Sequence, residues 1–155
     1  MVTGPIQQPS TVVAAARPPA RQHRPTHLGD IHALARALAA PAGEPRWRER
    51  LITRLDPVRQ GFAEHVRVTE GPTGFYAELL HHAPRLDRGV RLLTREHAAI
   101  ATAITALQHV AELPGVPDEE LCGRAGQLLR ALHRHRQRGA DLLWEAYEAD
   151  LGGET

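Results

Sequence analysis

Three histidines, His65, His97 and His135, occupy positions at which the apolar stripe of an amphipathic helix would carry a leucine. A neutral imidazole is the commonest metal ligand in proteins, whereas a buried imidazole without a partner costs free energy. The facing helices of a bundle can present several such rings to one point. These residue types therefore suggest metal binding inside a helical core. The alternative is three core histidines, each hydrogen-bonded to a carbonyl or a carboxylate.

Each of these histidines belongs to a run of apolar residues spaced alternately three and four positions apart. That spacing is typical of a helix packed in a bundle, where one stripe of side chains faces the core. The predicted core stripes are Leu51, Leu55, Val58, Phe62 and His65; Leu86, Val90, Leu93, His97, Ile100, Ile104, Leu107 and Ala111; and Leu121, Ala125, Leu128, Leu132, His135, Gly139, Leu142 and Ala146. A shorter stripe near the N-terminus comprises Ile31, Leu34 and Leu38, and His27 extends it by one step of four.

Turn and capping residues divide the chain into four main helices with short loops between them. We predict these helices at about residues 27–40, 46–69, 85–113 and 118–151, with a short helix at 75–82. Pro57 lies inside the second helix, which it should kink or split. Because short connections place neighbouring helices antiparallel, the expected fold is all-α. It is an up-down antiparallel four-helix bundle with a short extra helix between its second and third helices.

The predicted helices bring the stripe histidines to a similar height. Helices rise about 1.5 Å per residue, so His65, His97 and His135 differ by only about 6 Å when counted from the loops. On the first helix, His27 fits this layer better than His32 by height and by stripe. Its interval to His65 also equals the interval from His97 to His135. We therefore expect a metal site of His65, His97 and His135, completed by His27 or His32.

The composition argues against several classes of protein. The chain has 155 residues and a formal net charge of +1, which gives no reason to expect nucleic acid or an anionic membrane as a partner. No apolar run approaches the roughly 20 residues that a membrane span needs, and the single Cys122 fits a reducing compartment. We expect a cytoplasmic protein with one domain at 26–153, preceded at 1–25 by a disordered arm rich in proline, alanine and arginine.

Residues 27–150 resemble the hemerythrin-like family, the histidine-rich cation-binding four-helix bundles. The resemblance rests on His65 with Glu70 after it, on Arg95-Glu96-His97 with the apolar seam that follows, and on His133-Arg134-His135. It implies a non-haem iron centre, in bacterial members a di-iron centre bridged by carboxylates. It also implies binding of dioxygen or nitric oxide, or a role in redox sensing or iron storage, with no catalytic turnover that we can name.

Carried over residue by residue, the family pattern assigns metal binding to His65, His97 and His135, with Glu70 as a source of charge or a bridge. The pattern requires an acid four residues after His65, where this chain has Thr69. Glu70 comes one position later, about 140° round the helix from His65, and reaches inward only if the last helical turn loosens. The acid expected one turn after His135 is also missing. The implied ligand set is therefore up to four histidines and one carboxylate.

The same sequence allows two other functions. A metal-free bundle could act as a protein-interaction module, with the histidines packed and the basic arm contacting a partner. A redox enzyme acting on peroxide or nitric oxide at the same site is a third possibility, which turnover would distinguish. His133, one position off the stripe, could support a ligand or take the place of His135.

Two surface features complete the sequence predictions. The arginine-rich run 134–138 most simply forms a solvated face that pairs with acids such as Glu96 or Glu64. Trp144 and Tyr147 are about one turn apart, and either cover the end of the bundle or form the contact patch of a homodimer.

Overall fold

A computed structural model describes residues 26–151 of the chain, with side chains for residues 28–148. Within this range the chain is helical and contains no strand. The elements are α1 (Thr26–Ala39), α2 (Trp47–Glu70), α3 (Phe75–His82), the 3-10 turn η1 (Pro84–Leu86), α4 (Asp87–Glu112) and α5 (Asp118–Leu151). The short helix predicted at 75–82 coincides with α3. The arm predicted at 1–25 lies outside the described residues.

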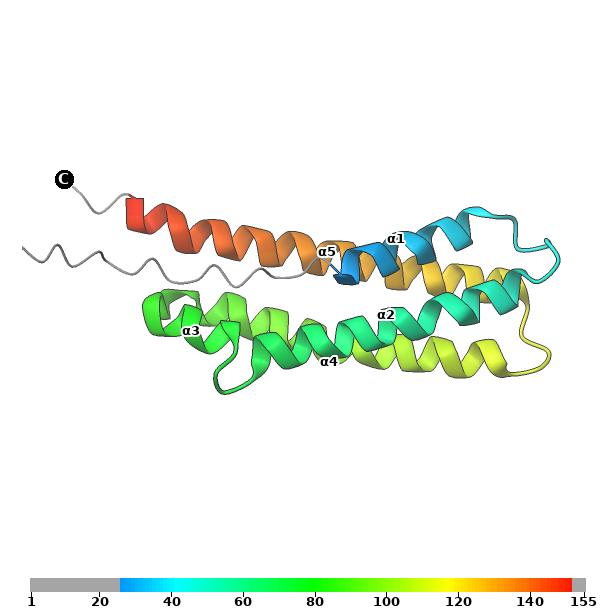
Figure 1. Cartoon of the computed structure of the whole chain (residues 1–155), viewed down its shortest axis with the longest axis horizontal. Helices are drawn as coiled ribbons and strands as arrows, with labels where there is room; N and C mark the ends of the chain where they lie inside the picture. Colours follow the sequence, from blue (N-terminus) through cyan, green and yellow to red (C-terminus); the bar gives the residue numbers. More distant parts are fainter. Residues whose placement is uncertain (1–25, 152–155) are drawn as a thin grey trace, which may run out of the picture.

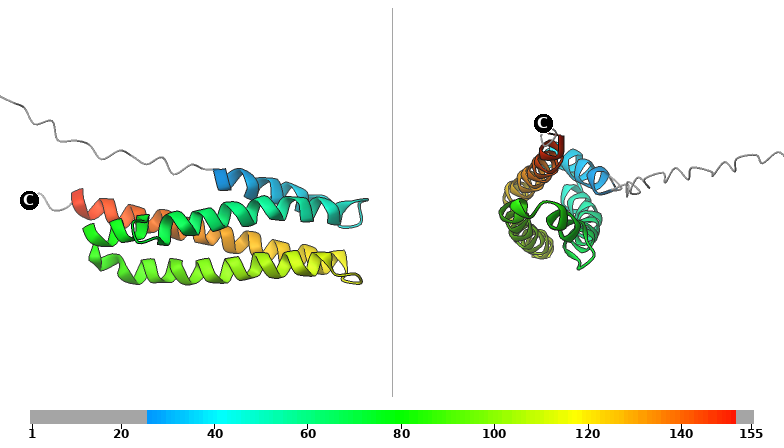
Figure 2. Two further views of the ribbon diagram at one scale, coloured as in Figure 1. Left: turned by 60° about the horizontal axis from the view of Figure 1, so that its bottom comes forward. Right: turned by 90° about the vertical axis from the view of Figure 1, so that its left-hand side faces the viewer.

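The helices pack along their lengths (Figure 1), as the predicted stripes require. α1 packs on α2, α4 on α5, and α2 on α4, and Figure 2 shows these helices around a common axis when viewed from one end. α1 extends along only part of the much longer α5. Beyond the start of α1, the bundle therefore consists of α3, α4, α5 and the end of α2. Among the described helices, none is long and apolar enough to cross a membrane.

The predicted core stripes are confirmed by the burial of their side chains. Every stripe residue from Leu86 to Ala111 is buried, and so is every one from Leu121 to Ala146 except the half-buried Gly139. In α2 the stripe is buried up to Phe62 and half-buried at His65. His97 and His135 are thus buried like the leucines of their stripes, whereas His65 is only half-buried.

Two apolar cores follow one another along the bundle, and the stripe histidines lie where they meet. The larger core is formed by α1, α2, α4 and α5, and the smaller by α3, η1, the start of α4 and the end of α5. On α4, His97 separates Leu93 of the smaller core from Ile100 of the larger one. His135 occupies the corresponding place on α5. A polar layer therefore interrupts an otherwise apolar interior.

Pro57 does not split α2. The helix runs without interruption from Trp47 to Glu70 with Pro57 inside it. Pro57 and Thr53 are both exposed, so the carbonyl of Thr53, which loses its usual N–H partner, can bond to water instead. The alternative of a split helix is wrong, and one continuous helix carries the stripe to His65.

Candidate metal centre

Three imidazole rings from three different helices converge on one point. His65 lies on α2, His97 on α4 and His135 on α5. Their Nε2 atoms are 3.1 Å apart between His65 and His97, 3.0 Å between His97 and His135, and 3.2 Å between His65 and His135. No other group of three or more histidine, cysteine, aspartate or glutamate side chains is gathered in this way within the part of the chain that the structure describes.

The spacing of the three nitrogens suits a single metal ion. With a metal–nitrogen bond of about 2.1 Å, two ligand atoms of a tetrahedral ion lie about 3.4 Å apart, and adjacent ligand atoms of an octahedral ion lie about 3.0 Å apart. The observed distances of 3.0 to 3.2 Å fall between these two values. Three histidines on one face leave further coordination positions open, as in metal sites that bind a water molecule or a substrate.

Two carboxylates fix the orientation of two of these rings. The Nδ1 atom of His97 lies 2.5 Å from Oε1 of Glu70, and the Nδ1 atom of His135 lies 2.9 Å from Oε2 of Glu96. An ionised carboxylate only accepts hydrogen bonds, so both Nδ1 atoms carry a proton and donate it. The Nε2 atoms of the two neutral rings then hold free lone pairs. Histidine metal ligands are typically oriented by an outer carboxylate in this way.

Glu96 makes a second contact, an ion pair with Arg138 of α5. This pair confirms the expectation that the arginine-rich run pairs with Glu96, and it holds the carboxylate that orients His135. Glu64, the other predicted partner, pairs instead with Arg67 on its own helix. The carboxylate on His97 is more accessible, because the Glu70 side chain is 32% exposed whereas that of Glu96 is 17% exposed.

Burial keeps His97 and His135 neutral. It lowers the pKa of both rings from the ordinary value of 6.5. The hydrogen bond that His97 donates to Glu70 acts in the opposite direction and raises the pKa of His97, but burial has the larger effect. A neutral ring keeps the lone pair that a metal ion needs, so metal binding near neutral pH requires no prior loss of a proton from these two rings.

Tyr76 and Thr69 bring two hydroxyl groups to the edge of the cluster. The ring of Tyr76 stacks on His97 with 5.7 Å between centroids, and its Oη atom lies 3.4 Å from His97 Nε2. Burial raises the pKa of Tyr76 to about 12, so its phenol keeps its proton at neutral pH. Thr69 is buried and donates a hydrogen bond to the carbonyl of His65.

An apolar pocket of about 350 Å³ adjoins the cluster. Its polar wall includes His65, His135, Thr69 and Tyr76, so a ligand in the pocket can approach the point at which the nitrogens converge. Most of the remaining wall is apolar and comes from α1, α2, α3, α4 and α5, namely Leu28, Ile31, Phe62, Phe75, Leu93, Leu132, Leu142 and Leu143.

The other candidate ligands lie away from the three nitrogens. α2 stays α-helical through Glu70, so Glu70 does not turn inward, and its carboxylate contacts the outer nitrogen of His97 instead. His32 is exposed on α1, and His133 is exposed on α5. The side chain of His27 lies outside the described residues.

Two neighbours of the cluster are not assigned to it by the sequence. Glu96 directly precedes His97, and this position on α4 turns its carboxylate towards α5; that adjacency is a signal that could have identified it. Tyr76 has no comparable signal, because its place depends on how the turn at 71–74 directs α3 across the bundle.

No protein-family model matches the chain, and neither a curated protein nor a solved structure matches it. A functional conclusion therefore depends on the geometry of the site.

Proposed function

We propose that the protein binds one divalent metal ion, iron in its working form, through the Nε2 atoms of His65, His97 and His135. The ion would leave coordination positions open to a small ligand, dioxygen or nitric oxide. The protein would use the ion to bind this ligand, to sense redox state or to store iron. The observation that carries the proposal is the convergence of three Nε2 atoms, two of them on rings whose Nδ1 atoms are held by carboxylates. The choice of iron as the metal, and of dioxygen or nitric oxide as its small ligand, comes from the resemblance to hemerythrin-like proteins. The up-down antiparallel topology and the cytoplasmic setting come from the sequence.

The donor set suits one ion better than two. A di-iron centre needs bridging carboxylates, but Glu70 and Glu96 are engaged with the outer nitrogens of two histidines. Thr69 stands where the family pattern has an acid, and its hydroxyl donates to a backbone carbonyl. Within the described side chains, no carboxylate joins the three nitrogens at their meeting point. We therefore propose a mononuclear site, with His27 as the candidate for a further protein ligand.

In this proposal the chain's own residues bind, orient and shield the ion. The imidazoles supply neutral donors, and Glu70 and Glu96 hold two of the rings in place. Phe62 packs against all three rings, with centroid distances of 5.7 to 6.1 Å, and excludes water from that side. The Tyr76 hydroxyl can donate a hydrogen bond to a ligand in the pocket. Bound ferrous iron would supply the open positions that take up dioxygen or nitric oxide.

Anaerobic loading of untagged protein with ferrous iron, followed by nitric oxide, tests this function. We expect a single iron per chain and an EPR signal from the iron that depends on nitric oxide. His97→Leu/His135→Leu should show neither. His81→Leu/His109→Leu, which replaces two exposed histidines, is the matched control and should behave as the native chain does. Iron without a response to nitric oxide would overturn the small-ligand role, and no iron would overturn the metal site.

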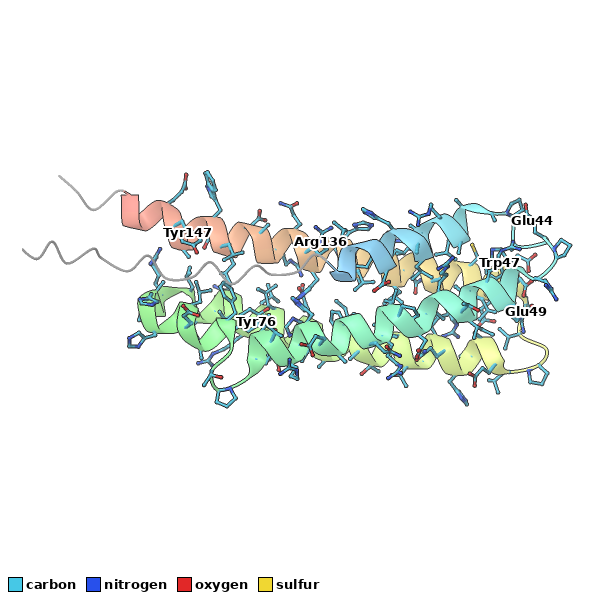
Figure 3. The ribbon with its side chains drawn as sticks, viewed as in Figure 1. Glu44, Trp47, Glu49, Tyr76, Arg136 and Tyr147 are labelled. Carbon is cyan, nitrogen blue, oxygen red and sulfur yellow. The ribbon has the colours of Figure 1, made fainter. Side chains whose placement is uncertain are left out.

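A metal-free interaction module is the second candidate function. Trp144 and Tyr147 are both 65% exposed and lie about one turn apart on α5, where Figure 3 labels Tyr147. Exposed aromatic side chains next to each other are typical of protein contact surfaces, including those of homodimers. This candidate expects Trp144→Ser/Tyr147→Ser to reduce self-association or partner binding in sedimentation experiments. A monomeric native protein that binds metal would exclude the homodimer version.

A further inference from the structure

The pocket beside the histidine cluster is much larger than a diatomic ligand. It encloses about 350 Å³, whereas one water molecule, which is similar in size to dioxygen, takes up about 30 Å³ of liquid. Pockets that bind small organic molecules begin at roughly 300 Å³. Dioxygen or nitric oxide would leave most of this space unfilled, and the dimensions fit an organic ligand.

The polar and apolar parts of the pocket are separated along α5. His135 and Arg136 line the pocket at one level, and Leu142 and Leu143 line it about 10 Å further along the helix. Leu93 of α4 also lines the pocket and, like Leu142, belongs to the smaller core. The pocket thus offers a polar end at the histidines and an apolar end towards the smaller core.

The charges on the pocket wall favour an anionic ligand. Arg136 is one of the lining residues, and no aspartate or glutamate is among them. Within the described part of the chain, the guanidinium of Arg136 forms no ion pair or hydrogen bond with another side chain. Figure 3 labels Arg136 on α5 close to the start of α1. A metal ion at the three histidines would add further positive charge at this end.

We infer that the pocket binds an unbranched aliphatic monocarboxylate. The carboxylate lies between Arg136 and the metal ion, within reach of the Tyr76 hydroxyl, and the hydrocarbon chain packs against Leu93, Leu142 and Leu143. The distance of about 10 Å along α5 between the levels of His135 and Leu142 guides the choice of an eight-carbon chain as the probe. The inference deepens the proposed function and rests on it for the metal end of the pocket, whereas the contact with Arg136 and the apolar section do not depend on a metal.

Calorimetric titration of octanoate into zinc-loaded protein tests the inference. Zinc uses the same nitrogen donors and has no redox chemistry, and its content is measured separately by elemental analysis. We expect saturable binding of one octanoate per chain. Butanoate should bind more weakly because it covers less of the apolar section, and octylammonium, which has the same chain and the opposite charge, should not bind.

Two variants locate the ligand. Arg136→Gln should weaken octanoate binding about tenfold, which corresponds to about 1.4 kcal/mol. Its control, Arg134→Gln, removes an exposed neighbouring arginine that does not line this pocket and should change nothing. Gly139→Leu should keep zinc and abolish octanoate binding, because Gly139 lines the pocket and a Cβ atom there meets nothing within 4 Å. Gly123→Leu on the same helix also has open space and is the matched control.

The possible results test the proposed octanoate pocket and the proposed metal site independently. Full zinc content without saturable octanoate binding would overturn the inference and leave the metal site standing. Equal binding of octylammonium, or unchanged binding to Gly139→Leu, would also overturn it. If the protein holds no zinc, the proposed function fails. Octanoate binding to that zinc-free protein with the same dependence on Arg136 and Gly139 would still support the pocket, and its absence would refute it.

Discussion

Replacing His97 and His135 together by leucine should abolish metal binding without destabilising the metal-free core. The two positions are 2% and 5% exposed and belong to stripes in which leucine is the expected residue. The change leaves no fully buried carboxylate without a partner. Glu70 is partly exposed and can turn to solvent, and Glu96 keeps its ion pair with Arg138.

The magnitude follows from mass action. A ligand that binds only the folded state stabilises it by about 2.7 kcal/mol when its free concentration is 100 times its Kd. For a folded region of this size, that energy raises the midpoint of thermal unfolding by roughly 10 °C. The double variant retains one imidazole of the three and should show no such rise. Without metal, it should unfold at or above the native midpoint, because leucine places no polar ring in the core.

Differential scanning calorimetry with and without zinc measures both effects. The matched control is His81→Leu/His109→Leu, which removes the same number of histidines from exposed positions and should keep the full zinc-dependent rise. A zinc-dependent rise that persists in the His97→Leu/His135→Leu variant would refute the assignment of the ligands. A large loss of metal-free stability in that variant would refute the argument that leucine suits both positions.

Three further results are expected. In metal-free protein, the stability that these rings contribute should be fully present above pH 6.5 and lost as the pH falls below it, because burial lowers the pKa of His97 and His135 and the unfolded chain binds their protons first. In urea unfolding between pH 5 and pH 8, the free energy of unfolding should change by up to about 2.7 kcal/mol per pH unit. A free energy that does not change with pH would contradict this prediction. Glu96→Gln should weaken zinc binding by about 10- to 100-fold in a competition titration, whereas Glu64→Gln at an exposed surface pair should not. Ile104→Ala should cost about 2 to 5 kcal/mol in urea unfolding, because Ile104 is 1% exposed in the larger core; a cost below 1 kcal/mol would argue against this packing.

The helices could be predicted because the stripes repeat without interruption over long stretches. The stripe through His97 keeps its three- and four-residue steps from Leu86 to Ala111, and all of it is buried. At Pro57 the sequence alone does not decide between a kinked helix and a split helix. The helix continues because the affected carbonyl lies on an exposed face, and exposure of that face cannot be judged from the proline alone.

The three clustered histidines could also be predicted, since helix rise and stripe position together fix where a side chain meets its neighbours. The role of Glu70 could not, because it depends on whether the last turn of α2 loosens and on the reach of a flexible side chain. It contacts the outer nitrogen of His97 rather than the point of convergence. Tyr76 and the pocket depend on the position of α3 and on where α1 begins, which are long-range features that no local pattern encodes.

The coordination of zinc by named nitrogen atoms tests the central claim most directly. Long-range nitrogen–proton NMR spectra of the histidine rings, recorded on metal-free and zinc-loaded protein, distinguish a metal-bound nitrogen from a protonated one. A single zinc per chain should shift the Nε2 resonances of His65, His97 and His135 and leave protons on Nδ1 of His97 and His135. Unchanged resonances of these three rings at full zinc content, or shifts confined to the exposed His81, His82 and His109, would contradict it.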